Sequence, residues 1–303
     1  MSAPTTVAAP TPLQVTLPDG RSFAWYEFGD PTGVPCLSTG GTPASGVMGQ
    51  VYDDVARAHG VRWISLDKPG YGHSSHDPQR SLARYTEDVR FLLDHLGLER
   101  AAFVGESGGG PHVYAVAHDL PERVTVAIPV SGLGPADEPW AREGMTALNR
   151  YMLTVAARAP WLLRASMALM SRTVFTHPRL LGAMMGLQLP ACDRQVLDAH
   201  PELLAALFAG TKGGFRQGSR AAAQEFSVFA RPWHFRLEDI RVPVELWHGT
   251  EDVNVPVAVA QEASRRVPLC RAHIVEGGGH LTYYAHREAI VAAVVRASLE
   301  TTS

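Results

Sequence analysis

Apolar runs alternate with helical patterns through the first 134 residues of the chain. The longest helical pattern runs from Leu82 to Leu96, with leucines and Val89 near helical spacing. Before and after it, short runs rich in β-branched and aromatic residues predict strands at 14–17, 23–28, 34–38, 61–66, 101–104 and 124–130. Strands that alternate with helices are typical of a parallel sheet with helices on both faces. The pattern therefore predicts the α/β class.

The pattern changes after Gly134. From Asp137 to Trp233 the sequence is helical, is interrupted by prolines and lacks a clear strand. Strands are predicted again at 242–247 and 272–275, and helices at 257–266 and 285–299. We interpret residues 1–134 and 236–303 as two parts of one α/β core, and residues 135–235 as a helical cap inserted between them.

Composition excludes several classes of protein. An apolar share of 46% in 303 residues is ordinary for a globular chain, and a net charge of -3 does not favour nucleic acid or an anionic membrane as a partner. The N-terminal segment lacks the basic region and apolar core of a secretory signal, and no apolar run is long enough to cross a bilayer. We expect a soluble, cytoplasmic protein with a small-molecule substrate. Its oligomeric state stays open.

One stretch carries a chemical signature, Gly105-Glu106-Ser107-Gly108-Gly109. It follows an apolar run and precedes a plausible helix, so the order is strand, tight turn and helix with a serine at the apex. The two outer glycines remove Cβ atoms that would clash in such a turn. Ser107 is therefore the candidate nucleophile.

A serine hydroxyl needs a base, and the base needs a carboxylate to orient it. Two late loops follow predicted strands in the required order, His248-Gly249-Thr250-Glu251-Asp252 and Gly277-Gly278-Gly279-His280. Asp252 is the candidate acid and His280 the candidate base. Asp137 is the reserve acid, and Glu251 is a weaker one.

An oxyanion hole needs two amide donors. The amide of Gly108 directly follows the nucleophile, and the glycine-rich loop after the third strand offers Thr42, with Gly41 as the alternative. No cofactor is expected. Three scattered cysteines, and histidines without ligand spacing, do not favour a metal site.

Candidate substrate contacts come from the loop after the third strand, from the helix after the turn at Ser107, which we call the elbow, and from the cap. Six of the eight methionines fall within the predicted cap, and methionine is common on surfaces that accept irregular apolar ligands. The alternative is that they pack the cap helices together. His112 could line the pocket floor or be a buried, hydrogen-bonded histidine. The full set of candidates is Gly40, His112, Trp140, Met145 and Met184.

From about Leu13 to Leu299 the chain resembles the α/β-hydrolase superfamily. The resemblance rests on the Ser107 motif, on Asp67-Lys68-Pro69-Gly70-Tyr71-Gly72 and on the two late loops. It implies an eight-stranded, mostly parallel sheet, a Ser-Asp-His triad and a cap over the pocket. The phrase Ala230-Arg231-Pro232-Trp233 is similar to one in uncharacterised capped hydrolases of this superfamily.

The chain departs from that family at Gly40-Gly41, where the family usually has His-Gly. That histidine normally holds the oxyanion loop through hydrogen bonds, so the resemblance implies a looser loop, or one shaped for an unusual substrate. The serine at position 107 argues against the haloalkane dehalogenase and epoxide hydrolase branches, which use aspartate there.

The leading hypothesis is a serine hydrolase that cleaves a carboxylic ester of a small apolar or aromatic substrate through an acyl-enzyme. A second hypothesis uses the same triad for carbon–carbon bond hydrolysis or for a biosynthetic lyase or cyclisation step. A third is a small-molecule receptor that retains the fold without catalysis.

Overall fold

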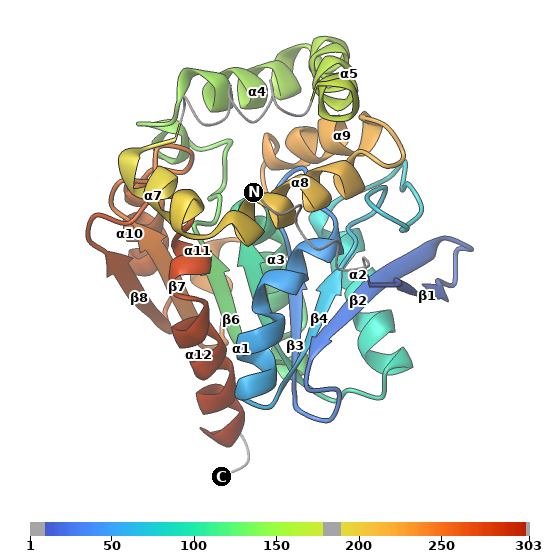
Figure 1. Cartoon of the computed structure of the whole chain (residues 1–303), viewed down its shortest axis with the longest axis vertical. Coiled ribbons are helices and arrows are strands. Elements are labelled where there is room, and N and C mark those ends of the chain that lie inside the picture. Colours follow the sequence, from blue (N-terminus) through green and yellow to red (C-terminus); the bar gives the residue numbers. More distant parts are fainter. Residues whose placement is uncertain (1–9, 178–188, 301–303) are drawn as a thin grey trace, which may run out of the picture.

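A single eight-stranded sheet forms the centre of the computed structural model, which describes residues 10–177 and 189–300 (Figure 1). The strand order is β1-β2-β4-β3-β5-β6-β7-β8. β1 and β2 are antiparallel to their neighbours, and all other pairs are parallel. Each predicted strand is confirmed with small shifts at its ends; the bounds are β1 Leu13–Thr16, β2 Ser22–Gly29, β3 Val34–Thr39, β4 Val61–Leu66, β5 Ala101–Glu106, β6 Val124–Val130, β7 Val244–Gly249 and β8 Cys270–Val275.

Helices cover both faces of the sheet. One face packs against α2 (Leu82–His95), α3 (Gly110–Asp119) and α10 (Val257–Arg266), and the other against α1 (Asp53–Ala58) and α12 (Arg287–Glu300). Successive residues of a strand point to opposite faces, so Trp63 and Ile64 of β4 enter different cores. Both are fully buried, which explains why the central strands read as continuous apolar runs.

The sequence also predicts a helix over 47–59, and the structure winds this segment in two ways. Residues Gly46–Tyr52 form the 3-10 helix η1, and the α-helix α1 begins only at Asp53. Gly46 and Gly49 bring this backbone directly against β4, because a Cβ at either position would lie 2.5 Å from an atom of Ser65. Glycine also disfavours a regular α-helix, which the sequence pattern did not weigh.

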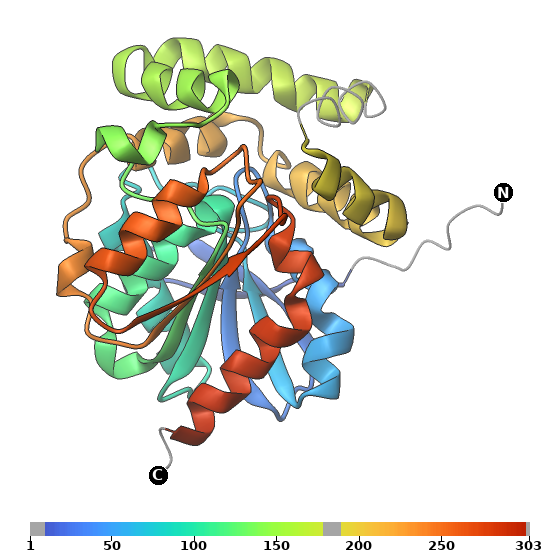
Figure 2. The ribbon, with the colours of Figure 1, turned by 90° about the vertical axis from the view of Figure 1, so that its left-hand side faces the viewer.

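Between β6 and β7 the described residues contain helices and no strand. We call these the upper helices: η4 Pro139–Arg142, α4 Ala147–Arg158, α5 Pro160–Thr176, α7 Ala191–Ala199, α8 Pro201–Gly214 and α9 Arg220–Phe229. Figures 1 and 2 show them lying across the carboxyl ends of the parallel strands. The boundaries of the predicted cap, 135 and 235, stay a prediction. The remaining short helices are η2 Ser107–Gly109, η3 Pro121–Arg123, η5 Leu237–Asp239 and α11 Thr282–Ala285.

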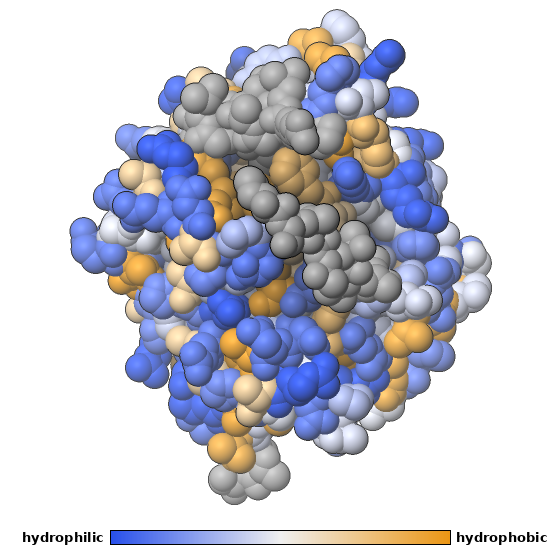
Figure 3. Space-filling model, in the orientation of Figure 1, coloured by the Kyte–Doolittle hydropathy of each residue, from blue (hydrophilic) through white to orange (hydrophobic). Residues whose placement is uncertain are grey.

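The face of the molecule seen in Figure 3 is mainly hydrophilic, with apolar residues scattered over it. The most exposed large apolar side chains include Trp161, Leu169 and Phe175 of α5. Across the described residues, no helix combines the length and apolar character needed to span a bilayer.

Candidate active site

Ser107 lies at the turn between β5 and α3, at the carboxyl edge of the sheet. Its φ is 51°, a left-handed conformation that is strained for a residue other than glycine and that clusters at functional sites. Two glycines make the turn possible: a Cβ at Gly105 would lie 2.6 Å from the Gly109 carbonyl oxygen, and one at Gly109 would lie 2.0 Å from the Thr39 carbonyl oxygen. Residues 101–106 and 108–110 are buried, whereas Ser107 is partly exposed. The turn thus presents this one side chain.

The loops after β7 and β8 bring Asp252 and His280 together. His280 Nδ1 lies 2.8 Å from Asp252 Oδ2, and the backbone amides of Asn254 and Val255 both donate to Asp252 Oδ1 at 2.9 Å. The carboxylate is buried and fully engaged, which fixes the imidazole and leaves its Nε2 for the reaction. The reserve acids Asp137 and Glu251 are both exposed, so the structure favours Asp252.

The described hydrogen bonds do not include one between the Ser107 hydroxyl and His280, whose ring bond goes to Asp252. In ligand-free structures, catalytic hydrogen bonds are often long and tighten when substrate binds. The geometry therefore joins two of the three predicted catalytic residues directly and places the third at the same edge of the sheet.

The buried pair stabilises the charged forms of both partners. Burial raises the pKa of Asp252, but the charge and hydrogen bond of His280 outweigh burial and lower it below its ordinary value. Burial lowers the pKa of His280, but Asp252, Asp193 and Glu106 outweigh burial and raise it above its ordinary value. Each partner thus favours the ionised state of the other.

Asp193 of α7 is a contact that sequence reasoning missed. Its two carboxylate oxygens accept the backbone amides of His280 and Leu281, both at 2.9 Å. The side chain is buried, and a Cβ at Gly279 would lie 2.3 Å from it. An upper helix therefore holds the loop that carries His280. Nothing in the sequence relates Asp193 to a loop 87 residues later.

Glu106 is a second group that sequence reasoning missed, because the motif Gly-x-Ser-x-Gly leaves this position unspecified. Its carboxyl group is buried directly before the nucleophile, and burial raises its pKa to about 7. When ionised, it favours the protonated form of His280. Three carboxyl groups, Asp252, Asp193 and Glu106, thus favour the protonated form of the imidazole.

These charges predict the pH dependence of hydrolysis. His280 acts as a base only when neutral, so kcat/KM should fall as pH falls through a His280 pKa above the ordinary value of about 6.5. Asp193→Asn removes one of the negative charges that raise the pKa of His280, so the acid limb of the pH–rate profile should move to lower pH. Asp198→Asn, which neutralises an exposed carboxylate on the same helix, should leave the limb in place. A limb that does not move in Asp193→Asn would contradict the assignment.

The loop after β3 lies directly against the elbow. A Cβ at Gly41 would lie 3.2 Å from the Cβ of Ser107, and one at Gly108 would lie 3.2 Å from the Thr42 amide nitrogen. The main chain of both predicted donor segments therefore borders Ser107. The assignment of Gly108 and Thr42 as donors, with Gly41 as the alternative, is consistent with this arrangement and stays a prediction.

Three of the predicted substrate contacts, His112, Trp140 and Met145, lie against other groups of the protein. His112 is buried with Nδ1 3.1 Å from the Gly108 carbonyl oxygen, so it supports the elbow from within and does not line an open pocket. The Trp140 ring lies against Arg266 of α10, and Met145 is buried in a cluster with Leu153 and Phe229. Both side chains are engaged in packing.

Two further candidates in that set stand differently. The Gly40 carbonyl accepts a hydrogen bond from Lys68 Nζ at 2.9 Å and supports the loop. Met184 lies outside the described residues.

Two other features of the structure do not belong to this site. Asp119 accepts hydrogen bonds from His118 and His234. Each of the three side chains offers one atom that could bind a metal ion, and these atoms lie within 4.8 Å of one another. Sequence spacing missed this cluster because His234 is 115 residues from Asp119. Thr86 also donates to Asp119, and the cluster thereby joins α2, α3 and the segment before β7.

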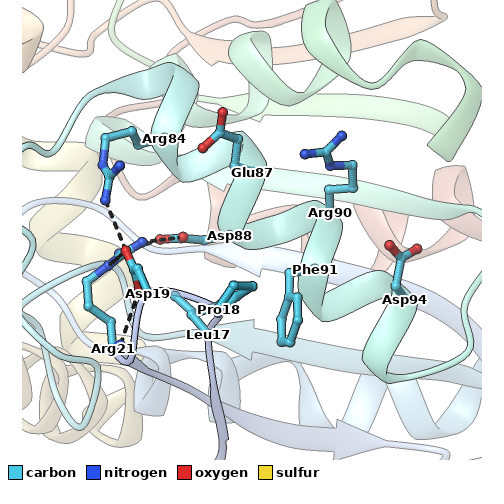
Figure 4. A pocket seen from close by; sticks show the side chains of 10 residues that line it. All are labelled: Leu17, Pro18, Asp19, Arg21, Arg84, Glu87, Asp88, Arg90, Phe91 and Asp94. Carbon is cyan, nitrogen blue, oxygen red and sulfur yellow. Dashed lines mark hydrogen bonds and ion pairs between the residues drawn. The ribbon is translucent and has the colours of Figure 1, made fainter.

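The second feature is a surface groove of about 410 Å³ between the β1–β2 turn and α2 (Figure 4). Arg21 of the turn pairs with Asp88 of α2, and Arg84 of α2 pairs with Asp19 of the turn, so two ion pairs cross the groove. It contains none of the predicted site residues.

Comparisons with known proteins agree with this fold. The family model described as alpha/beta hydrolase fold matches residues 41–286. Among curated relatives, the dihydrolipoyllysine-residue acetyltransferase component of the acetoin cleaving system of Pseudomonas putida is 35% identical over 138 residues, which are 44% of this chain and 37% of that protein. The 2-hydroxymuconate semialdehyde hydrolase of Pseudomonas putida is 26% identical over 241 residues, which are 75% of this chain and 73% of that protein.

The match covers only 37% of the length of that acetyltransferase component and 61% of the length of an uncharacterised protein of Mycobacterium bovis. Among solved structures, the enol-lactonase from Burkholderia xenovorans LB400 superimposes with a TM-score of 0.68 over 95% of this chain and 100% of that one. At 18% identity this likeness shows the fold alone.

Proposed function

The chain belongs to the α/β-hydrolase fold family, and within that family we propose that it is a serine hydrolase that cleaves a carboxylic ester. The observation that carries this proposal is the hydrogen bond between His280 and Asp252, formed at the sheet edge that also presents the strained Ser107. A fold alone would not require these three side chains to meet at one edge. Such a constellation is what acyl transfer needs.

In the proposed reaction, Ser107 Oγ attacks the ester carbonyl carbon while His280 Nε2 takes the hydroxyl proton. The amides of Gly108 and Thr42 stabilise the negative oxygen of the tetrahedral intermediate. His280 then returns the proton to the departing alkoxide, which leaves as an alcohol. Water attacks the acyl-enzyme by the same route and releases the carboxylic acid. Asp252 stays ionised throughout and stabilises the imidazolium.

The support for an apolar acyl group has changed. The cap methionines that lie within the described residues pack the upper helices. Met145 and Met167 are buried, and Met152 and Met170 pack against the cluster that contains Met167. The packing alternative therefore accounts for them. Leu133 is an apolar residue beside Ser107: it is partly exposed, its amide donates to the Ser107 carbonyl at 3.0 Å, and it packs against the Met145 cluster.

A graded ester series tests this proposal. With p-nitrophenyl acetate, butyrate and octanoate, we expect turnover of at least one ester and higher kcat/KM for the longer apolar chains. Preference for acetate would overturn the apolar assignment and leave the esterase proposal intact. A lack of turnover on all esters would overturn the esterase proposal.

Carbon–carbon bond hydrolysis is the second candidate function. The matched 2-hydroxymuconate semialdehyde hydrolase is named for a substrate without an ester, so its hydrolysis has to break a carbon–carbon bond. Product analysis by mass spectrometry on a vinylogous diketone distinguishes the two reactions. Cleavage of the diketone without ester turnover would favour this candidate.

A further inference from the structure

Lys68 holds the loop Gly40–Thr42, which we call the oxyanion loop. Its Nζ donates to the carbonyl oxygens of Gly40 and Gly41 at 2.9 and 3.0 Å, and its side chain is fully buried just after β4. A peptide unit is planar and trans, so its carbonyl and its N–H point in opposite directions. The Gly41 carbonyl shares its plane with the Thr42 amide. Lys68 binds that carbonyl together with the Ala44 amide, which donates to it at 2.9 Å, and thereby helps to fix the direction of the predicted oxyanion donor.

The other end of this contact is Glu225 on α9, one of the upper helices. Glu225 Oε1 lies 3.0 Å from Lys68 Nζ, and Oε2 accepts the Thr42 hydroxyl at 2.5 Å. Burial raises the pKa of Glu225, but the charges of Arg80 and Lys68 outweigh burial and hold the pKa at about 2. A permanently ionised carboxylate from the helical layer therefore binds both the oxyanion loop and the lysine that orients it.

Stability alone does not account for this cluster. Buried ion pairs are weak stabilisers, because desolvation offsets most of the attraction. Burial lowers the pKa of Lys68 to about 8 although Glu225 favours its charged form. Arg80 already forms an ion pair with Glu225 and donates a hydrogen bond to the Pro69 carbonyl. Lys68 adds a second buried cation, and what it alone reaches is the oxyanion loop.

We propose that Lys68 and Glu225 are positioning residues that set the oxyanion hole, so that the docking of α9 onto the sheet completes the site. This inference rests on the proposed function. The resemblance implied a looser loop because Gly40 replaces a histidine. In the structure, two buried side chains bind the loop instead: Lys68, which follows β4, and Glu225 of α9. Ester hydrolysis thereby depends on contacts made by residues that never touch the substrate.

The test compares Lys68→Met with Arg80→Met. Each variant removes one buried cation from Glu225 and leaves the other paired, but only Lys68 contacts the oxyanion loop. At pH 7 we expect Lys68→Met to lower kcat for ester hydrolysis by about 10- to 100-fold with KM little changed, because displacing an oxyanion donor costs less than the 10²–10³ of deleting one. Arg80→Met should lower kcat by less than about 3-fold. Equal losses in the two variants would overturn the proposal.

Hydrogen–deuterium exchange provides a readout that needs no substrate. Exchange at the amides of residues 40–42 should be faster in Lys68→Met than in Arg80→Met, and equal exchange would overturn the proposal whatever the activity. If the wild type hydrolyses no ester but the loop responds as expected, the proposed function fails and the positioning role stands. If Lys68→Met does not fold, Lys68→Gln, which retains one donor group, should show the same effects in weaker form, and wild-type behaviour there would contradict the role.

Discussion

Replacing Ser107 with alanine should abolish ester hydrolysis and labelling by a fluorophosphonate probe. The expected loss in kcat is about 10⁴- to 10⁶-fold, because the variant has no atom that can attack the carbonyl. The variant should fold, since alanine and serine tolerate the φ of 51° about equally. Labelling followed by mass spectrometry of the peptide that contains residue 107 gives the measurement.

Ser131 offers a matched control for this experiment. It is the other described non-glycine residue with a positive φ, 47°, but it is fully buried after β6. Ser131→Ala should retain labelling at Ser107 and most of the activity. Equal labelling of the wild type and Ser107→Ala would show that another residue is the nucleophile, and the proposed mechanism would then be wrong.

Replacing Asp252 with asparagine should lower kcat by about 10⁴-fold while the protein stays folded. Asp252 Oδ1 accepts the amides of Asn254 and Val255, so the asparagine oxygen has to remain on that side. The new NH2 group then faces His280 Nδ1, which can only accept from it. His280 Nε2 consequently carries the proton and can no longer take one from Ser107. The effect comes from the tautomer, and KM should change little.

Glu251→Gln serves as the control for that variant, because it removes an adjacent carboxylate that is exposed. We expect near wild-type kcat from it. A loss below about 10-fold in Asp252→Asn would mean that another carboxylate orients the base. Asp193 would be the first to examine, because it is buried and its charge also acts on His280.

Local patterns were enough to predict the sheet and the elbow. The strand at 101–106 and the helix at 110–119 are encoded by apolar runs and by glycines that permit one tight turn, all within 19 residues. The loops that carry Asp252 and His280 were found because parallel strands bring their carboxyl ends to one edge. These features depend on backbone periodicity and turn chemistry, which a sequence states directly.

The substrate contacts stay a prediction for a related reason. Met145 and Trp140 were chosen for residue type, but type does not say which way a helix faces. A methionine that packs two helices and one that meets a ligand read identically in a sequence. His112 similarly has the same one-turn spacing from Ser107 whether its ring enters a pocket or the interior.

What the sequence determined by itself is the α/β pattern, the turn at Ser107 and the order of nucleophile, acid and base. What only the tertiary structure decided is how the helical layer engages them: Asp193 on the base loop, and Glu225 on Lys68 and the oxyanion loop. These contacts join residues 87 to 183 positions apart. Their formation depends on how α7 and α9 dock onto the sheet, and docking follows from the summed packing of many side chains, which no local pattern records.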